Sequence, residues 1–307
     1  MLYNRVLITG ANGLVGQALV RRMSRFPEYD VLATSRDDEP RFSGGSCGYS
    51  PLDVTNPDEV EAIFQDFTPN VVVNCAAMSD AAACADHREA AWAVNAGAVQ
   101  TLARCCRSTG ARLVQVSTDF VFDGRDGPYE EDARPNPVND YGRTKLAGEN
   151  AVREAGPSKW AIARTVLVYG TADGPTRSNV VLWVLNELLQ NEPLHVVDDQ
   201  WRTPTYVEDL AAGIERMIHF EKTGIYHLSG RELLTVYDLA CRVADVFDLD
   251  DSLIHPVSSD YFDDAIDRPP KTGFLILKAE SEIGYKPRSL EDGLRHLGRR
   301  LDHPVTS

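Results

Sequence analysis

The clearest potential for chemistry lies in a tyrosine and a lysine four positions apart, Tyr141 and Lys145. Residues at this spacing on a helix share one face. A tyrosine with an unperturbed pKa of about 10 exchanges protons poorly near neutrality, but an adjacent ammonium group favours its phenolate form. The pair is therefore typical of a site in which Tyr141 moves a proton and Lys145 makes the tyrosine usable.

A hydroxyl group precedes this pair in the chain. Thr118 follows the apolar residues 113–116, and the carboxyl end of a parallel strand faces the crevice in which such sheets bind ligands. We predict that Thr118 hydrogen-bonds a substrate carbonyl oxygen while Tyr141 donates a proton to it. The alternative is an exposed helix face that carries a tyrosine and a lysine by chance.

A glycine-rich turn near the start of the chain favours the first interpretation. Residues 9–16 read TGANGLVG, after a β-branched run and before a helical pattern. Gly10 would permit the tight turn, Gly13 would let the backbone approach a pyrophosphate, and Gly16 would let the helix close on the strand. We predict a dinucleotide on the N–H groups of this helix N-terminus, hence hydride transfer. The other cofactor residues of this turn are Asn12, Leu14 and Val15.

The end of the next strand indicates which dinucleotide binds. Ser35 and Arg36 stand about twenty residues after Gly16, where NAD enzymes place a carboxylate for the ribose hydroxyls. Arg36 would pair with a 2′-phosphate, although Asp37 and Asp38 follow directly. We therefore expect NADP(H) to be preferred and leave NAD(H) open; the alternative for Arg36 is a solvated surface arginine.

Small residues at the ends of later strands would let the cofactor lie across the sheet. Asp53 is a candidate hydrogen-bond acceptor for the adenine amino group, with a helix cap or turn as the alternative. Lys145 should also bind the ribose of the nicotinamide, so that it and Tyr141 count among the cofactor residues. The remaining predicted cofactor residues are Val54, Cys75, Ala76 and Ala77.

The elements that position these residues alternate along the first half of the chain. We predict strands at 6–9, 31–34, 71–75, 113–116 and 161–165, and helices at 14–25, 57–67, 88–108 and 141–154. The strands are apolar throughout rather than alternating, as in sheets covered on both faces. This predicts an α/β fold with a doubly wound parallel Rossmann sheet.

The second half has a looser pattern, with helices predicted at 179–190, 207–220 and 235–247. We expect residues 1–169 to form an NADP-binding Rossmann domain. Residues 170–307 would mainly form a smaller C-terminal substrate-binding region, with 203–228 returning to the first domain.

Composition limits the partners. The chain has 307 residues, 43% of them hydrophobic, and a net charge of −15, which disfavours nucleic acid and anionic membranes. The six cysteines form no CxxC pair, and the histidines show no HxxxH or HExxH spacing, so we expect reduced thiols and no metal. Without a signal-like start or an apolar run of about 20 residues, a cytoplasmic location is expected.

These motifs, in this order, resemble the extended short-chain dehydrogenase/reductases over nearly the whole chain. Residues 117–124, STDFVFDG, resemble the STDYVFDG signature of dTDP-4-dehydrorhamnose reductases, and residues 141–149, YGRTKLAGE, resemble their YGxTKLAGE. The segments ART at 163–165, VYG at 168–170, DQ at 199–200 and TPT at 203–205 resemble further family motifs, as does the Arg268-Pro269 dipeptide.

This resemblance implies reduction of a nucleotide-linked 4-keto-6-deoxysugar at C4, with the cofactor as hydride source. The partner would then be a small-molecule sugar nucleotide. By the same resemblance the candidate substrate residues are Asp119, Phe120, Trp201, Arg202, Thr205 and Arg268.

The chain departs from the family on the substrate side. Where the family usually carries a carboxylate and a hydrophobe facing the sugar, this chain has alanine at 81, 82, 83 and 85. Asp80 would compensate from a shifted position. The departure leaves the identity of the sugar open.

Two other functions remain open. One is an epimerase or dehydratase of the same superfamily; those dehydratases carry acidic residues after the threonine, and here only Asp119 is present. The other is a non-catalytic NADP-binding regulatory subunit resembling the beta subunit of methionine adenosyltransferase, which the intact Tyr141, Lys145 and Thr118 disfavour. A homodimer is compatible with such a fold.

Overall fold

Seven parallel strands form the central sheet of this computed structural model, which describes residues 4–43, 47–155, 158–174, 178–262, 266–303 and 305. The strand order is β11-β6-β5-β4-β1-β2-β3. The strands are β1 (Asn4–Thr9), β2 (Tyr29–Ser35), β3 (Gly48–Pro51), β4 (Val71–Asn74), β5 (Arg112–Thr118), β6 (Trp160–Thr165) and β11 (Gly224–His227).

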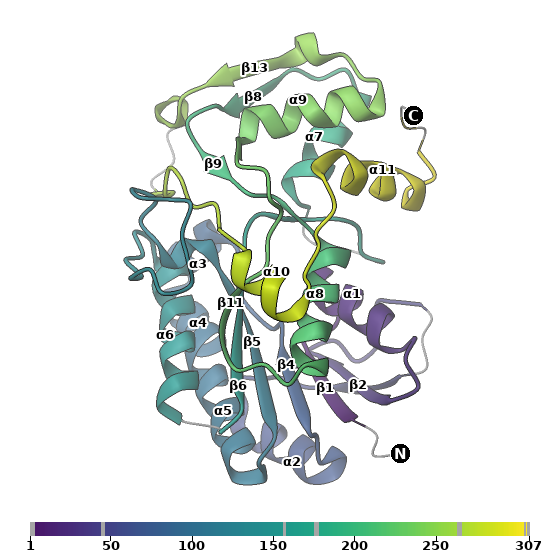
Figure 1. Cartoon of the computed structure of the whole chain (residues 1–307), viewed down its shortest axis with the longest axis vertical. Coiled ribbons are helices and arrows are strands. Elements are labelled where there is room, and N and C mark those ends of the chain that lie inside the picture. Colours follow the sequence, from purple (N-terminus) through teal and green to yellow (C-terminus); the bar gives the residue numbers. More distant parts are fainter. Residues whose placement is uncertain are drawn as a thin grey trace.

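Successive strand residues pack into two separate cores, because a strand points its side chains alternately to the two faces of the sheet. Val6 and Ile8 of β1 belong to one core, and Leu7 belongs to the other. Helices α1 (Leu14–Met23) and α8 (Val207–His219) cover the first face; α2 (Pro57–Phe67), α5 (Ala98–Thr109) and α6 (Asp140–Ala155) cover the second (Figure 1). The doubly wound parallel sheet predicted from the sequence is confirmed.

The predicted helices and strands agree with the structure to within two residues at each end, with one exception. The single helix predicted over 88–108 is interrupted: α4 (Arg88–Trp92) passes through a π-helical turn (Ala93–Gly97) into α5. Such turns arise where a local contact outweighs regular helical bonding. Here Asn95, in the turn, is fully buried and bonds to neighbouring segments.

The second half of the chain builds the upper part of the molecule and returns once to the sheet (Figure 1). The strands there form two-stranded pairs, β10 with β7, β12 with β9 and β13 with β8, while α8 and β11 rejoin the central sheet. The strands of these pairs are β7 (Val168–Tyr169), β8 (Leu194–Val197), β9 (Trp201–Arg202), β10 (Thr205–Tyr206), β12 (Leu234–Thr235) and β13 (Ile254–Val257). The remaining helices are α3 (Ala81–Asp86), α7 (Val180–Leu189), α9 (Val236–Phe247), α10 (Leu277–Ile283) and α11 (Leu290–Arg300).

Within the described residues, no helix combines the length and apolar character needed to cross a membrane.

Candidate functional site

The sheet changes direction between β1 and β4, which are neighbours although β2 and β3 separate them in the chain. Ligands of open parallel sheets bind at the carboxyl ends of strands at such a switch point. Gly10 ends β1 there with a φ of 65°, and a Cβ on it would lie 2.6 Å from the backbone nitrogen of Ala76. Cys75 and Ala76 are half-buried and Ala77 is exposed at the same edge. The structure thus brings the predicted residues of β1 and β4 together.

The N-terminus of α1 fits a pyrophosphate. Gly13 is exposed, no side chain caps the helix, and its first turn has no acidic residue, so its N–H groups and positive dipole end are open to an anion. Gly16 is buried, and a Cβ there would collide with Gly10 and Ala11. Leu14 and Val15 are half-buried in the first turn. The glycines therefore leave room in the two places where the sequence requires it.

The adenosine end differs in part from the sequence prediction. Arg36 is exposed, and no described residue pairs with it. Asn12 and Ser35 are buried, and their side chains bond to each other, with 2.8 Å between Nδ2 and Oγ. The Asp53 carboxylate accepts bonds from the N–H and hydroxyl of Thr55, which is the turn alternative. Its neighbour Val54 is buried in the core below.

The predicted proton-transfer residues meet where β5 ends and α6 begins. Lys145 is buried and its Nζ donates to the carbonyl of Val116, 2.8 Å away. Thr118 is the last residue of β5, and its hydroxyl donates to the Asp119 carboxylate at 3.0 Å. Tyr141 is half-buried in the first turn of α6, with its ring centre 5.7 Å from that of Phe120. The three side chains predicted from the sequence thus lie at one edge of the sheet.

Lys145 has a pKa that is shifted toward neutrality. Burial lowers its pKa from 10.5 to about 8, and the Glu149 carboxylate, one turn further along α6, acts in the opposite direction. A lysine with such a pKa changes charge near the pH at which a tyrosine with an ammonium neighbour exchanges protons. Because Tyr141 and Lys145 lie one turn apart on α6, a charged Lys145 favours the phenolate form of Tyr141.

Glu149 anchors the helix that carries this pair. Its fully buried carboxylate accepts bonds from Ser117 Oγ at 2.7 Å and from Arg164 Nε and Nη2 at 2.8 and 2.7 Å. Lys145 and Glu149 thus hold the consecutive residues 116 and 117 of β5, just before Thr118. Sequence reasoning assigned no role to Glu149 or Arg164. The available signal was a charged residue inside an apolar strand and another on a buried helix face.

A second anchor that sequence reasoning missed is Asn95. Its side chain bonds to both backbone groups of Met78, at 3.0 and 2.9 Å, and to the hydroxyl of Thr144, next to Lys145. A Cβ on Gly148 would collide with the Asn95 carbonyl oxygen. The π-helical turn therefore joins the backbone at Met78 to the face of α6 that carries Thr144. The only signal for it in the sequence was an asparagine followed closely by glycine in a helical pattern.

The predicted substrate residues form a second cluster. Asp119 and Arg202 are both buried, with Oδ2 and Nε 3.8 Å apart, and Thr272 donates to the same carboxylate. Burial raises the pKa of Asp119, and Arg202 acts in the opposite direction. The Arg202 guanidinium also lies 5.7 Å from the ring centre of Phe120. Phe120 therefore connects this cluster to Tyr141.

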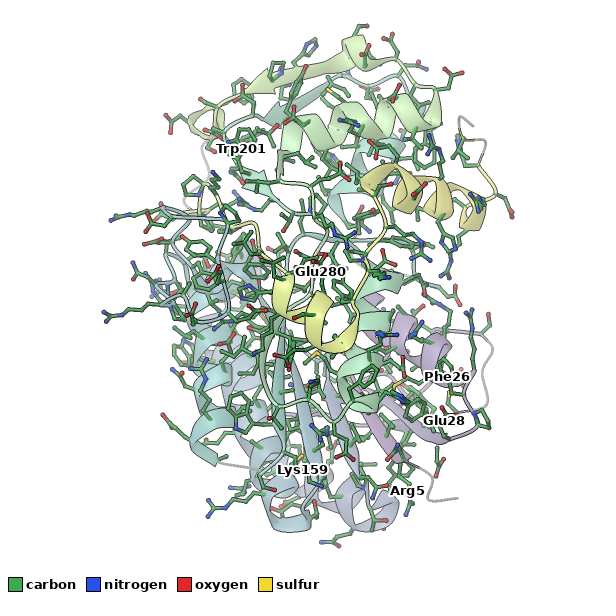
Figure 2. The ribbon with its side chains drawn as sticks, in the orientation of Figure 1. Arg5, Phe26, Glu28, Lys159, Trp201 and Glu280 are labelled. Atoms are coloured by element: carbon green, nitrogen blue, oxygen red, sulfur yellow. The ribbon has the colours of Figure 1, made fainter. Side chains whose placement is uncertain are left out.

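Two arginines stand at this cluster. Arg268 is exposed. Burial lowers the pKa of Arg202 most, Asp119 raises it, and the nearby charge of Arg268 lowers it further. Trp201 is 39% exposed, between the two parts of the molecule (Figure 2), and its backbone is bonded to Pro270 and Thr272. An exposed cation is suited to an anionic group, and an exposed aromatic ring to a planar one.

Thr205 and Asp80 are engaged by bonds within the chain. Thr205 is fully buried and its hydroxyl donates to the carbonyl of Val166 at 2.7 Å, which makes it part of the packing below the site. Thr205 was predicted from a motif, and burial of β10 against β7 takes it away from the surface. The Asp80 carboxylate caps α3, with its Oδ1 accepting from the N–H groups of Ala82 and Ala83.

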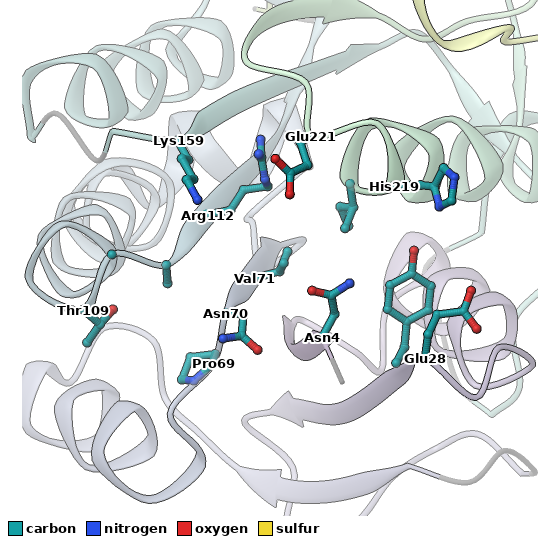
Figure 3. A pocket seen from close by; sticks show the side chains of 14 residues that line it. Asn4, Glu28, Pro69, Asn70, Val71, Thr109, Arg112, Lys159, His219 and Glu221 are labelled. Carbon is teal, nitrogen blue, oxygen red and sulfur yellow. The ribbon is translucent and has the colours of Figure 1, made fainter. Parts of the chain in front are cut away.

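A cavity of about 240 Å³ lies at the opposite end of the sheet, among the amino ends of the strands. Arg112 and Lys159 lie on one side of it, and Glu28 and His219 on the other (Figure 3). None of the predicted site residues lines it. We place the candidate site at the carboxyl ends because the glycine turn, Thr118 and Tyr141 converge there. Among the residues that the structure describes, no group of three or more His, Cys, Asp or Glu is placed to hold a metal ion.

Known proteins resemble this chain over most of its length. The family model described as the RmlD substrate binding domain matches residues 4–302. The dTDP-4-keto-6-deoxy-D-glucose reductase of Streptomyces niveus is 36% identical over 258 residues, 84% of this chain and 83% of that protein. Methionine adenosyltransferase 2 subunit beta of Bos taurus is 34% identical over 259 residues, 83% of this chain and 75% of that protein.

A solved structure agrees with this chain throughout. The dTDP-4-dehydrorhamnose reductase of Bacillus anthracis, in complex with NADP, superposes with a TM-score of 0.86 at 30% identity, covering 97% of this chain and 99% of that one.

Proposed function

Because the chain belongs to the RmlD substrate-binding domain family, we propose that it is an NADP(H)-dependent reductase of a nucleotide-linked 4-keto-6-deoxysugar. The observation that carries the proposal is the meeting of Thr118, Tyr141 and Lys145 beside the uncapped N-terminus of α1. The reductase of Streptomyces niveus and the NADP complex of the Bacillus anthracis enzyme support it.

The residues of the chain divide the work as follows. NADPH, when bound, supplies a hydride to the carbonyl carbon. Tyr141 donates a proton to the carbonyl oxygen, and Thr118 holds that oxygen in place once its hydroxyl has turned from Asp119 to the substrate. Lys145 stabilises the phenolate that remains and binds the ribose next to the nicotinamide. The first-turn N–H groups of α1 bind the pyrophosphate, and Arg36 pairs with the 2′-phosphate.

The sugar nucleotide lies against the second cluster. Arg268 faces its diphosphate, and the buried Arg202 adds positive charge to that side of the site. Trp201 stacks on its base, and Phe120 packs on the sugar beside Tyr141. Asp119 holds Arg202 in position through their buried pair. In this proposal residues 1–169 with 203–228 bind the cofactor, and most of 170–307 binds the substrate.

A dehydratase or epimerase is the second candidate. Those dehydratases use acidic residues after the threonine, but here the Asp119 carboxylate is buried and engaged by Thr118, Thr272 and Arg202. A carboxylate in such a pair is poorly placed to exchange protons with a substrate. A reductase consumes NADPH with each turnover, whereas these enzymes keep their cofactor.

A regulatory subunit is the third candidate, favoured by the 34% identity to methionine adenosyltransferase 2 subunit beta. The geometry argues for turnover, because a regulator has no chemical need for a tyrosine, a buried lysine and a threonine at one strand end. NADPH binding without oxidation in the presence of keto-sugars would support the regulator.

The test is oxidation of NADPH, followed by absorbance, on addition of dTDP-4-keto-6-deoxy-glucose to the purified protein. We expect turnover in the wild type and a rate about 10²–10⁴-fold lower in Tyr141→Phe, with NADPH binding retained.

Equal rates in the two proteins would overturn the role of Tyr141. Failure of the wild type to bind NADPH would overturn the cofactor site at Gly10.

A further inference from the structure

The loop after β2 is folded back onto the glycine-rich turn by one side chain. Asn12, only 6% exposed, donates from Nδ2 to Ser35 Oγ at 2.8 Å and to Asp37 Oδ2 at 2.6 Å, and also to the carbonyl of Glu39. Its Oδ1 accepts from the backbone N–H of Arg41 at 2.9 Å. One amide thus fixes the whole 35–41 segment, the segment that decides which dinucleotide fits.

The hydroxyl of Ser35 makes all of its hydrogen bonds to groups of the chain. Tyr49 donates its only hydroxyl hydrogen to the carbonyl of Asp37 at 2.6 Å, so the 2.8 Å bond between Tyr49 and Ser35 takes the hydrogen of Ser35. Ser35 Oγ also accepts from Asn12. Ser35 therefore has no hydrogen left to donate to a phosphate, and selectivity at this position comes from charge.

Asp37 is the residue whose charge matters most. Arg41 grips its carboxylate with two bonds of 3.0 Å, Nε to Oδ2 and Nη2 to Oδ1. Asn12 lowers the pKa of Asp37 most, and Arg41 adds to the effect, so the carboxylate is ionised and its charge is matched by the guanidinium. Arg36, beside it, is exposed and pairs with no described residue. With Asp37 paired, Arg36 is left as the described cation of this corner without a pairing carboxylate, next to the exposed Asp38 and Glu39.

The two dinucleotides respond to this corner in opposite ways. A carboxylate just past β2 accepts a hydrogen bond from the 2′-hydroxyl of NADH and repels the 2′-phosphate of NADPH. Asp37 stands in that region, two residues beyond the end of β2. Left unpaired, it would oppose the action of Arg36; paired with Arg41 and tied to Asn12, it does not.

We propose that Asn12 and Arg41 form a selectivity clamp, which holds Asp37 as a neutralised pair and so makes the site accept NADPH rather than NADH. Asn12 is on this view a positioning residue rather than a cofactor contact. The inference rests on the proposed function, since it concerns the same cofactor site, but it concerns binding and needs no keto-sugar.

The test is titration of the intact protein with NADPH and with NADH, followed by nicotinamide fluorescence. Arg41→Gln should weaken NADPH binding about tenfold and leave NADH binding unchanged or tighter. Adding Asp37→Asn should restore NADPH binding, because the corner regains its original net charge. Arg104→Gln removes the arginine of an exposed pair between α5 and Glu61 of α2; it is the matched control and should change neither titration.

Asn12→Ala extends the test by a second route. It should shift the preference in the same direction, and Asp37→Asn should again reverse the shift. If Asn12→Ala fails to fold, the Arg41 pair of variants still decides the question.

Three outcomes overturn the clamp. Equal weakening of both dinucleotides by Arg41→Gln would mean that the loop has merely lost its structure. A double variant as weak as Arg41→Gln would mean that Arg41 itself contacts the phosphate. A wild-type protein that binds NADPH and NADH equally well would refute the clamp but not the proposed reductase activity. Conversely, selective NADPH binding without oxidation of NADPH would remove the reductase and leave the clamp.

Discussion

The cofactor side and the substrate side of the candidate site are held together differently. On the cofactor side, Lys145 and Glu149 of α6 grip neighbouring residues of β5, and Gly10 packs against the end of β4. On the substrate side, Asp119, Arg202 and Thr272 come from three segments far apart in the chain. The first side is part of the sheet, and the second is an assembly of loops around one buried ion pair.

The difference indicates which part of the site depends on side chains and which on the backbone. Backbone pairing joins two of the three substrate segments, with Trp201 N–H donating to the carbonyl of Pro270 at 2.7 Å and Thr272 N–H donating to the carbonyl of Trp201 at 3.2 Å. Because backbone bonds do not depend on side-chain identity, the facing side chains are free to change. The alanines of α3 fit this view, since that wall has lost its carboxylate while α3 is still capped by Asp80.

The largest effect should come from breaking the cofactor side at Glu149. Glu149→Ala leaves Arg164, only 1% exposed, without its carboxylate, and should lower the free energy of unfolding by about 3–5 kcal/mol. Chemical denaturation measures it. Glu61→Ala removes an exposed pair with Arg104 at 3.7 Å and, as the control, should change stability by less than about 0.5 kcal/mol. Similar losses in the two variants would refute the buried anchor.

Breaking the substrate side at Arg202 should have a smaller effect. Arg202→Gln leaves Asp119 buried without its cation. A double-mutant cycle with Asp119→Asn should give a coupling free energy of about 1–3 kcal/mol. This is less than the loss expected for Glu149→Ala, because Asp119 and Arg202 are 3.8 Å apart. We expect NADPH affinity to stay within about twofold of the wild type while the KM for the sugar nucleotide rises. A parallel loss of NADPH binding would show that the two sides are not independent.

A pH titration probes the cofactor side more gently. Since the pKa of Lys145 falls from 10.5 to about 8 on folding, the unfolded chain binds more protons between these values, and this group makes stability rise with pH across that window. The charged lysine supports Tyr141 only below about pH 8, so kcat/KM should fall on the alkaline side, by at most about tenfold per pH unit. Glu149→Gln should move this limb to lower pH, and an unmoved limb would assign it to another group.

The smallest effect is expected at Trp201. Its side chain is 39% exposed, whereas its backbone holds Pro270 and Thr272, so Trp201→Ala should change stability by about 0.5 kcal/mol or less. Loss of base stacking should raise the KM for the sugar nucleotide several-fold, about 1 kcal/mol, with kcat unchanged. Steady-state kinetics measures both constants, and an unchanged KM would remove Trp201 from the substrate site.

Much of the frame could be predicted because it is encoded by neighbours in the sequence. The apolar strands, the helix periods and the glycine turn each depend on residues within a few positions of one another, and their bounds agree with the structure to within two residues except at Asn95. Thr118, Tyr141 and Lys145 lie together for the same reason: the carboxyl end of a strand and the first turns of a helix are defined locally.

The sequence did not determine the hydrogen-bond partners of the buried polar side chains, although it did determine the helices and strands that carry them. Asn12 and Ser35 were predicted to contact the cofactor, yet each bonds to the chain, and Thr205 was predicted at the substrate although it is fully buried. The roles of Glu149, Arg164 and Asn95 depend on segments that come together only when the sheet closes over its helices.

The sequence by itself thus determined the doubly wound sheet, the open helix N-terminus and the edge at which a tyrosine, a lysine and a threonine meet. The tertiary structure decided which polar groups face a ligand and which face each other. The physical reason is that burial removes water as an alternative partner, so each enclosed donor and acceptor bonds to whatever group the distant parts of the chain bring beside it.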